Sequence, residues 1–473
     1  MKILVAIANF GTKNAKHLVR LLKEYRSMTR YRVDIVVLSN IPKHLGSDIE
    51  VIVGLPTNNP WSLPFGYKKL FFERAQQYDL FIYSEDDTLI TERNIDSFVN
   101  ISKVLPGNYI AGFIRYEISE SGKKFYSTIH AHYHWDHNSV VQHGEYIFAR
   151  YTNDHSGCFI LTQSQLKKSI QSGGFLLPPR MGRYDMLVTA ATDPYTQCGM
   201  KKVICISHLD DFCLHHLPNV YCGKIGVDAA YADLEIEKLK SLKGKEEPCG
   251  PLFDTSTSLD DPIWDKEYYE QRRDDILSLV PRGVRSVLSI GCGHGTTESE
   301  LVKRGIRVVG IPLDCVIQES AAARGIKVLV PNFEKARKSL KDEQFDCILF
   351  PDVLQHLPAP VLIVREFLPI LGRDGSMIFS VPNFNHPSVW QRRILGDLPL
   401  PQTKHQQSFA KYKVHFTTRR MLCKWLKECE LTVVRSYRST NPGKKCIDNL
   451  TLKGMKGKFQ ENIVVLSKRE SSQ

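Results

Sequence analysis

The sequence predicts an α/β protein in which two α/β domains share one chain of 473 residues. Strand-like apolar runs alternate with helix-like patterns in the first part of the chain, as in a mostly parallel sheet. The composition then becomes charged and afterwards rich in Pro, Gly, Ser, Thr and Asp. The strand–helix alternation restarts beyond this stretch and passes through a glycine-rich turn. We therefore expect domains at 1–232 and 263–473, joined by a linker at 233–262.

The bulk composition limits the class of protein. Hydrophobic residues make up 42% and charged residues 24%, which is typical of soluble globular proteins. The twelve cysteines are scattered without a Cys-x-x-Cys pair, which favours reduced thiols and a cytoplasmic location. No apolar stretch approaches 18 residues, and the N-terminal run is too short for a signal peptide, so we expect no transmembrane segment.

The net charge of +12 is spread along the chain without a basic block. We therefore expect no nucleic-acid partner. The charge is compatible with anionic substrates or with loose attraction to an acidic membrane surface.

The first domain begins as a strand–helix–strand pattern. Apolar residues recur at helical spacing within the first of the two predicted helices. The predicted strands lie at 3–8, 34–38 and 80–83, and the predicted helices at 15–30 and 67–77.

Three acidic residues, Glu85, Asp86 and Asp87, follow the third apolar strand. Carboxylates at the C-terminal end of a parallel strand lie at the sheet edge where ligands bind. Three neighbouring acids repel one another, so a divalent cation or a basic partner is expected there.

This arrangement resembles the Asp-x-Asp motif of GT-A glycosyltransferases, and the strand at 157–162 resembles that family's acceptor-side strand. The resemblance implies a GT-A-like nucleotide-sugar fold, with Mn²⁺ or Mg²⁺ held against the diphosphate of a nucleotide sugar. Glu85 and Asp87 would be metal ligands, and Asp86 would bind the nucleotide sugar. A saccharide would be the acceptor.

The same resemblance suggests further residues. Asp185, at the start of a helix pattern, would be the base that activates the acceptor hydroxyl, although a helix N-cap is an equally good role for it. His215 or His216 would be a late metal ligand.

A second metal pattern competes with this interpretation. Residues 132–137, HYHWDH, spell the His-x-His-x-Asp-His motif of metallo-β-lactamase-fold hydrolases. Clustered imidazoles and a carboxylate form chemically sound zinc or iron sites. The α/β context favours instead an aromatic, His-rich loop that contacts a saccharide through Tyr133 and Trp135. A glycan-binding domain without catalysis also remains open for this half.

The second domain is predicted to contain a helix at 264–279 and then alternating strands and helices. Its expected strands lie at 286–290, 307–311, 328–330, 345–350 and 376–381. Gly291, Gly293 and Gly295 follow the first of these strands. A glycine turn between a strand and a helix lets backbone N–H groups approach a ligand closely.

This half resembles class I S-adenosylmethionine-dependent methyltransferases of the small-molecule type found in ubiquinone and menaquinone synthesis, over residues 264–468. The lead-in segment 264–279, the glycine motif 287–295, the segment 345–383 with its His-Leu-Pro turn, and the Phe-Thr helix at 415–431 carry the resemblance. It implies a Rossmann-like fold and S-adenosylmethionine as cofactor.

Residue by residue, the resemblance implies a donor site at the strand ends. Asn332 would face the adenine, and Asp352 and Val353 would line the methionine side. Ser289 and Pro312 stand where the family has acids, and Asp314 is the candidate substitute for the second. The turn that would wrap the methionine end of the donor comprises Gly291, Cys292, Gly293 and Gly295.

His356 is the candidate general base, because a neutral imidazole can take a proton from a hydroxyl nucleophile. A turn-capping role for His356 and a non-catalytic methyltransferase fold both remain open. The two resemblances together predict a bifunctional enzyme that transfers a sugar and a methyl group, in surface-polysaccharide or secondary-metabolite synthesis.

Overall fold

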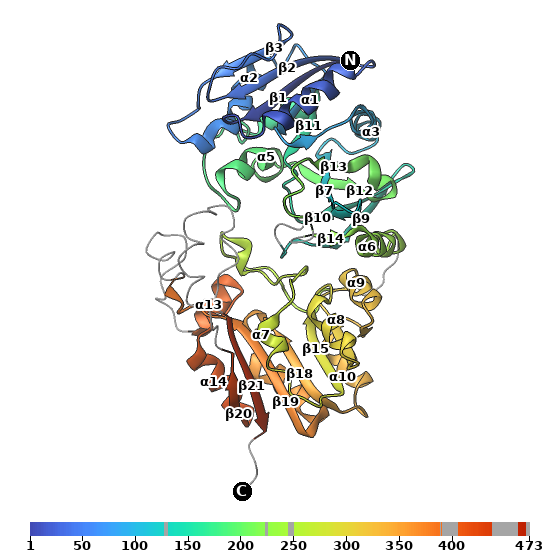
Figure 1. Cartoon of the computed structure of the whole chain (residues 1–473), viewed down its shortest axis with the longest axis vertical. Coiled ribbons are helices and arrows are strands. Elements are labelled where there is room, and N and C mark those ends of the chain that lie inside the picture. The colour runs from blue at the N-terminus through green and yellow to red at the C-terminus, as the bar shows by residue number, and fades with distance from the viewer. Residues whose placement is uncertain are drawn as a thin grey trace. The chain divides into compact units, whose positions relative to one another are not determined.

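The computed structural model describes residues 1–126, 131–222, 226–244, 250–387, 389, 405–437 and 462–469. The chain separates into two compact units. The first comprises residues 1–129 and 133–246, and the second comprises residues 130–132 and 247–473. Both units mix helices and strands (Figure 1).

The first unit contains a five-stranded sheet in the order β3-β2-β1-β4-β11. Strands β1 to β4 are parallel, and β11 is antiparallel to β4. The bounds are β1 Lys2–Asn9, β2 Arg32–Ser39, β3 Ile49–Val53, β4 Leu80–Glu85 and β11 Cys158–Thr162. Each predicted strand of this half is confirmed. The two central strands, β1 and β4, are buried along almost their whole length, which explains their continuous apolar sequences.

The helices of this unit are α1 Ala15–Ser27, α2 Tyr67–Glu73, α3 Glu92–Ser102, α4 Gln163–Gln171, α5 Met186–Thr196 and α6 Ala229–Ser241. The helix predicted at 15–30 ends three residues early, and the one predicted at 67–77 ends at Glu73. Helix α6 occupies the start of the stretch that composition identifies as a linker.

Two smaller sheets complete the first unit, in the orders β6-β12-β10-β9 and β14-β8-β7-β13-β5. Their short strands are the part of this half that residue periodicity does not reveal. The bounds are β5 Thr88–Leu89, β6 Tyr109–Ala111, β7 Ile114–Ile118, β8 Lys124–Tyr126, β9 Trp135–His143, β10 Tyr146–Tyr151, β12 Lys201–Cys205, β13 Cys213–His216 and β14 Val227–Asp228.

The second unit is built on a seven-stranded sheet in the order β17-β16-β15-β18-β19-β21-β20. The strands are parallel except β21, which pairs antiparallel with β19 and β20. The chain order reverses between β15 and β18, which makes their carboxyl ends the topological switch point of a doubly wound sheet. The bounds are β15 Ser286–Cys292, β16 Arg307–Pro312, β17 Lys327–Val328, β18 Phe345–Pro351, β19 Leu371–Pro382, β20 Leu431–Ser436 and β21 Asn462–Arg469.

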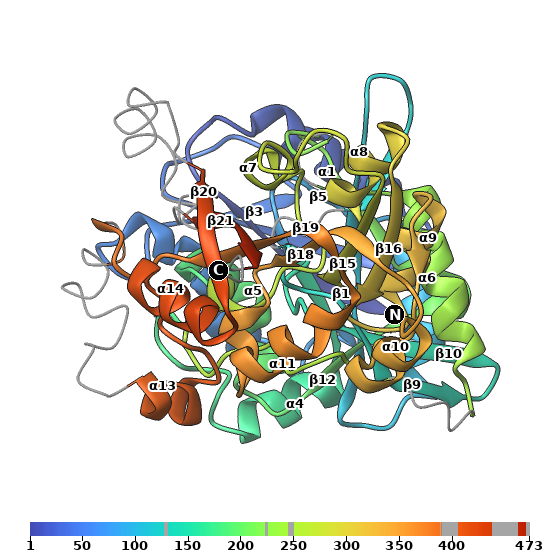
Figure 2. The ribbon, with the colours of Figure 1, turned by 90° about the horizontal axis from the view of Figure 1, so that it is seen from below.

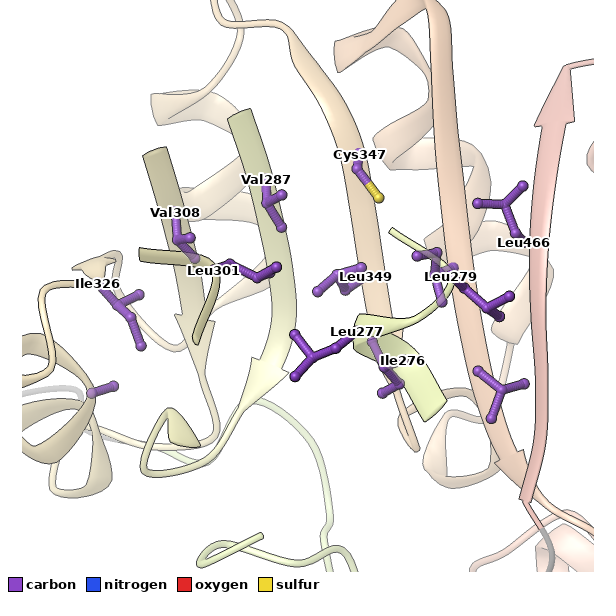
Figure 3. Close-up of a cluster of buried hydrophobic side chains, with 13 residues drawn as sticks. Ile276, Leu277, Leu279, Val287, Leu301, Val308, Ile326, Cys347, Leu349 and Leu466 are labelled. Atoms are coloured by element: carbon purple, nitrogen blue, oxygen red, sulfur yellow. The ribbon is translucent and has the colours of Figure 1, made fainter. Parts of the chain in front are cut away.

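Helices cover both faces of this sheet (Figure 2). Side chains of α7, α8 and α9 pack with five strands on one face (Figure 3). On the other face, α10 contacts α11 through Phe333 and Phe367, and α11 packs beside α14. The bounds are α7 Asp274–Leu277, α8 Thr296–Lys303, α9 Ile317–Ala323, α10 Phe333–Ser339, α11 Pro360–Phe367, α13 His405–Tyr412 and α14 Arg419–Glu428.

The helix predicted at 264–279 is wrong for most of its length, since only α7, Asp274–Leu277, is α-helical. The preceding segment is extended and makes long-range contacts. Tyr268 and Tyr269 donate backbone hydrogen bonds to Ala131, and the Lys266 ammonium donates to Pro351 at the end of β18. These tertiary bonds replace the helical ones.

Two further findings concern the bulk predictions. No helix within the described ranges is long and apolar enough to cross a bilayer. Nine described cysteines are free thiols, whereas Cys315 is disulfide-bonded, which the scattered spacing did not predict.

Candidate functional site

The glycine turn of the second unit lies at the topological switch point. Gly291, the penultimate residue of β15, has a φ of 73°, and Gly295 precedes α8 with a φ of 82°. Both values lie in the left-handed region that side chains other than glycine disfavour. A Cβ atom on Gly291 would lie 2.7 Å from Val353 and 3.4 Å from Phe253. The absence of a side chain at Gly291 thus lets Val353 and Phe253 approach the backbone of the turn closely.

Gly293 serves a different close contact. A Cβ atom there would lie 2.1 Å from the carbonyl oxygen of Tyr268, and the His294 N–H donates to that same oxygen over 2.9 Å. The glycine therefore lets the lead-in segment cross the turn. Cys292, which lies between Gly291 and Gly293 in the sequence, is buried, and burial raises the pKa of its thiol. The donor-binding roles of Gly293 and Cys292 stay predictions.

A carboxyl group stands beside Ser289 despite the missing family acid. The Ser289 hydroxyl donates to Glu298 of α8 over 2.6 Å, and both residues are buried. Burial raises the pKa of Glu298. Glu298 carries no motif signal in the sequence, because its contact with Ser289 links residues nine positions apart across the turn.

Asp314 is buried just beyond β16. One of its carboxylate oxygens accepts hydrogen bonds from the N–H groups of Val316 and Ile317, both over 2.8 Å. It therefore holds the entry to α9. Asn332 likewise caps α10, since its side chain accepts from the Lys335 N–H. Their predicted contacts with ribose and adenine remain predictions.

Asp352, directly after β18, combines backbone strain with an ion pair. Its φ is 50°, which is unusual for a residue other than glycine, and such strain often marks functional sites. Arg273 and the Ser380 hydroxyl both donate to its carboxylate. Burial favours the neutral acid, but the Arg273 charge outweighs this and keeps the pKa of Asp352 low. Arg273, which also pairs with Asp275, carries no motif signal in the sequence.

His356 lies in the short 3₁₀ turn after β18 and is 2% exposed. Neither ring nitrogen has a hydrogen-bond partner within the described part of the chain. Burial, with help from the Lys266 charge, lowers the pKa of His356 to about 3. The imidazole is therefore neutral, and its ring stacks near-parallel with Phe253 at 6.0 Å.

These residues fit an S-adenosylmethionine site. The turn has a cradle that a Cβ atom would fill, and a buried imidazole nearby lacks a polar partner. The carboxyl groups of Glu298 and Asp352 come from elements that meet at the switch point, and each already accepts hydrogen bonds from side chains of this unit.

In the first unit, Asp86 lies at the carboxyl edge of the parallel sheet, just after β4. It accepts hydrogen bonds from Asn9, at the end of β1, over 2.5 Å and from Asn14 over 2.7 Å. Burial raises the pKa of Asp86 to about 6. The parallel pairing of β1 and β4 brings Asn9 close to Asp86, and Asn14 reaches Asp86 from the start of α1.

The neighbouring acids are paired with basic groups. Arg115 lies 3.7 Å from Glu85, and burial raises the pKa of Glu85 to about 7. His216 lies 3.6 Å from Asp87 and contacts Glu117 over 2.6 Å. Burial opposes ionisation of Asp87, but the His216 contact outweighs it and lowers the pKa of Asp87.

The predicted metal ligands do not form a metal site as they stand. His215 faces away from His216 along β13; it contacts Asn219 over 3.0 Å and stacks on Tyr116. Across the described residues, no group of three or more His, Cys, Asp and Glu side chains could hold a metal ion. Two basic side chains, Arg115 and His216, thus lie beside the acids for which Mn²⁺ or Mg²⁺ was predicted.

The competing His-rich motif is likewise divided. Strand β9 begins at Trp135, so Trp135 and His137 are buried while Asp136 lies on the other face. Asp136 accepts from the Asn138 N–H and shapes a local turn. The metallo-β-lactamase arrangement is therefore not formed by the described side chains. Asp185 caps α5 by accepting from the Val188 N–H over 3.0 Å, and its role as a base stays a prediction.

Comparison with known proteins supports the assignment of the second unit. Residues 271–461 match the family described as Methionine biosynthesis protein MetW. The ubiquinone biosynthesis O-methyltransferase of Actinobacillus pleuropneumoniae serotype 7 is 30% identical over 109 residues, which cover 21% of this chain and 46% of the relative. That of Pseudomonas fluorescens is 27% identical over 146 residues, covering 28% and 62%. The C-terminal region thus resembles S-adenosylmethionine-dependent methyltransferases.

The chain spans about half the length of the first curated relatives it matches. Among solved structures, a SAM-dependent methyltransferase from Methanosarcina mazei is 18% identical, with a TM-score of 0.31; the match covers 42% of this chain and 99% of that one. A possible histamine N-methyltransferase from Thermotoga maritima is also 18% identical, with a TM-score of 0.30 and coverage of 42% and 86%.

Proposed function

We propose that the second unit transfers a methyl group from S-adenosylmethionine to an acceptor. The observation that carries the proposal is the glycine turn at the switch point, within a region that resembles methyltransferases. When bound, the donor supplies a methyl group that its sulfonium already makes electrophilic. The protein's task is then mainly to bind and orient the reactants.

The described residues divide this task between them. The turn at Gly291 presents backbone groups, and Arg273 fixes Asp352 in its ionised form beside it. His356 can accept a hydrogen bond from an acceptor hydroxyl and so orient it. Because its pKa is about 3, it binds a proton weakly in this arrangement. A sugar hydroxyl as acceptor is part of the proposal.

Calorimetry with S-adenosylhomocysteine tests the donor site. Gly291→Ala and Gly305→Ala form a matched pair, because both glycines have positive φ but only a Cβ on Gly291 would meet neighbouring atoms. We expect Gly291→Ala to weaken binding at least tenfold and Gly305→Ala to leave it unchanged. Equal affinities of the two variants for S-adenosylhomocysteine would show that the ligand does not bind at the Gly291 turn. Absence of binding at millimolar ligand, in the wild type and in Phe253→Ala, would refute the donor assignment.

For the first unit we propose binding of a nucleotide sugar at the carboxyl edge of β1 and β4. The specific support is Asp86, which two asparagines hold in place although burial opposes its ionisation. Sugar transfer to a saccharide is the proposed reaction, and joining the two units would raise the local concentration of the glycosylated product near the methylating site. No step in this proposal uses a divalent cation.

A panel of nucleotide sugars distinguishes transfer from binding alone. Release of nucleoside diphosphate in the presence of a saccharide indicates transfer, whereas saccharide binding without release indicates a glycan-binding module. Asp86→Asn is expected to weaken nucleotide-sugar binding, and Asp48→Asn, which alters an exposed ion pair with Arg26, is expected to leave it unchanged. Equal binding by both variants would refute the role of Asp86.

A further inference from the structure

Residues 250–257, here called the strap, are attached to the second unit. The Leu252 N–H donates to the carbonyl of Leu313, just after β16, over 2.7 Å. Thr255 accepts a backbone hydrogen bond from Lys266, and Thr257 is bonded to Asp265. The strap is therefore part of this unit rather than a free linker, and it crosses the carboxyl ends of the sheet.

One strap side chain, Phe253, lies within the predicted donor site. Its ring is near-parallel to Phe333 at 6.4 Å and to His356 at 6.0 Å. An atom of the same ring lies 3.4 Å from where a Cβ on Gly291 would be, and Val353 lies 2.7 Å from that point. Phe253 is 9% exposed, so the ring is enclosed.

The enclosing residues come from the ends of four adjacent strands. Gly291 lies near the end of β15, Leu313 follows β16, Phe333 begins α10 after β17, and Val353 and His356 follow β18. This is the crevice in which doubly wound sheets bind their ligands. It holds a flat aromatic ring between apolar walls, which is also the shape that a heteroaromatic ring such as adenine requires.

The Phe253 ring offers no hydrogen bond to the imidazole of His356 beside it. Both nitrogens of the buried His356 lack partners among the described residues. A buried polar group without a hydrogen bond is costly, and an apolar ring offers it none. A polar ligand could hydrogen-bond to the imidazole, so this part of the crevice is better matched to a polar ligand than to Phe253.

We propose that the strap is an intramolecular occupant of the methyl-donor site, with Phe253 in space that the donor would fill. This inference rests on the proposed methyl-donor function. The ring and the donor exclude each other, so the donor binds only to molecules whose strap has swung out. The apparent dissociation constant is then the intrinsic constant divided by the open fraction.

Calorimetry with S-adenosylhomocysteine on the full chain tests the exclusion. Phe253→Ala is expected to bind about tenfold or more tightly than the wild type, as follows if the strap is closed in about 90% of molecules or more. The matched control is Leu259→Ala, which shortens a buried side chain that packs with Trp264 and Phe384, outside the crevice. The control is expected to keep wild-type affinity.

Hydrogen exchange on the wild-type chain gives a second readout that does not depend on a variant folding. Ligands usually protect the segments they bury, whereas displacement of the strap would break the bond from Leu252 and speed the exchange of its amide. Equal or weaker binding by Phe253→Ala, or protection of the Leu252 amide by ligand, would show that Phe253 is a wall of the site and overturn the inference. If neither the wild type nor Phe253→Ala binds S-adenosylhomocysteine, both the donor assignment and the inference are wrong. If both bind it with the same high affinity, the inference is wrong and the donor assignment is supported.

Discussion

Replacing Asp86 by asparagine should stabilise the first unit at neutral pH. Burial raises the pKa of this carboxyl from 3.8 to about 6. Ionising it in the folded state therefore costs about 3 kcal/mol of unfolding free energy at pH 7.5. The cost is absent below pH 3.8, grows between pH 3.8 and 6, and is complete above that range. Asp86→Asn removes the charge and with it this cost.

The surrounding hydrogen bonds can accommodate the amide. Asn9 and Asn14 both donate to Asp86, and the side-chain oxygen of Asn9 has no other partner in the described part of the chain. Reversal of the Asn9 amide would let it accept from the new NH₂ group. The stabilisation should thus approach 3 kcal/mol, which is about 6–12 °C in the unfolding temperature of a unit of this size.

Scanning calorimetry at pH 4 and pH 7.5 measures the effect. The stabilisation should be large at pH 7.5 and nearly absent at pH 4. Asp48→Asn is the control with the opposite sign, because its hydrogen bonds with Arg26 lower the pKa of Asp48. A destabilised Asp86→Asn at pH 7.5, or an effect equal at both pH values, would contradict the reasoning. Stabilisation together with lost ligand binding would indicate that the charge is retained for function.

Three further results are expected in the second unit. Gly293→Ala should lower the unfolding temperature by several degrees, because its Cβ would lie 2.1 Å from the Tyr268 carbonyl; an unchanged value would show that the segment yields freely. The NMR signals of His356 should not titrate between pH 8 and 4, since burial lowers its pKa to about 3, and a titration near pH 6.5 would contradict its enclosure. Ser289→Asp should destabilise the unit more at pH 8 than at pH 5, because it adds a second carboxyl group beside Glu298. The double variant Ser289→Asp/Glu298→Gln should regain stability. If it does not, repulsion between the two carboxylates is not the cause.

Most of the sheet architecture follows from the sequence. The central strands β1, β4, β15 and β18 are buried on both faces, so their residues form continuous apolar runs. The short strands β5, β8 and β14 contain two or three residues each and have no period to detect. Strand β21, which lies antiparallel between β19 and β20 in the larger sheet, was not predicted either.

The lead-in segment shows why local pattern misjudged one region. Residues 266–273 contain helix-forming side chains, but their backbone groups bond to distant residues instead. The buried ammonium of Lys266 reaches Pro351, and Arg273 reaches Asp352, 79 residues away. Such contacts depend on the finished fold, so propensity alone could not reveal them.

The position of the acids after β4 was predicted, but their ion-pair partners were not. Acids at the end of β4 belong at the edge of a parallel sheet, and the sequence shows them there. Their neutralising groups, Arg115 and His216, come from β7 and β13, which are far away in the sequence. The three adjacent acids suggest a positively charged partner, but the sequence does not show that Arg115 and His216 lie beside them.

The two departures from the methyltransferase pattern have different structural consequences. Glu298 places a carboxyl group beside Ser289, so the methionine end of the proposed donor site would keep an acid. Pro312 is not compensated in the same way, because the nearby Asp314 uses one carboxylate oxygen to accept the N–H groups that begin α9. In the proposed site, the ribose would therefore lack the carboxylate with which the family holds it. A donor held less firmly at its ribose would compete less well for the site with an aromatic side chain of the same chain, such as Phe253.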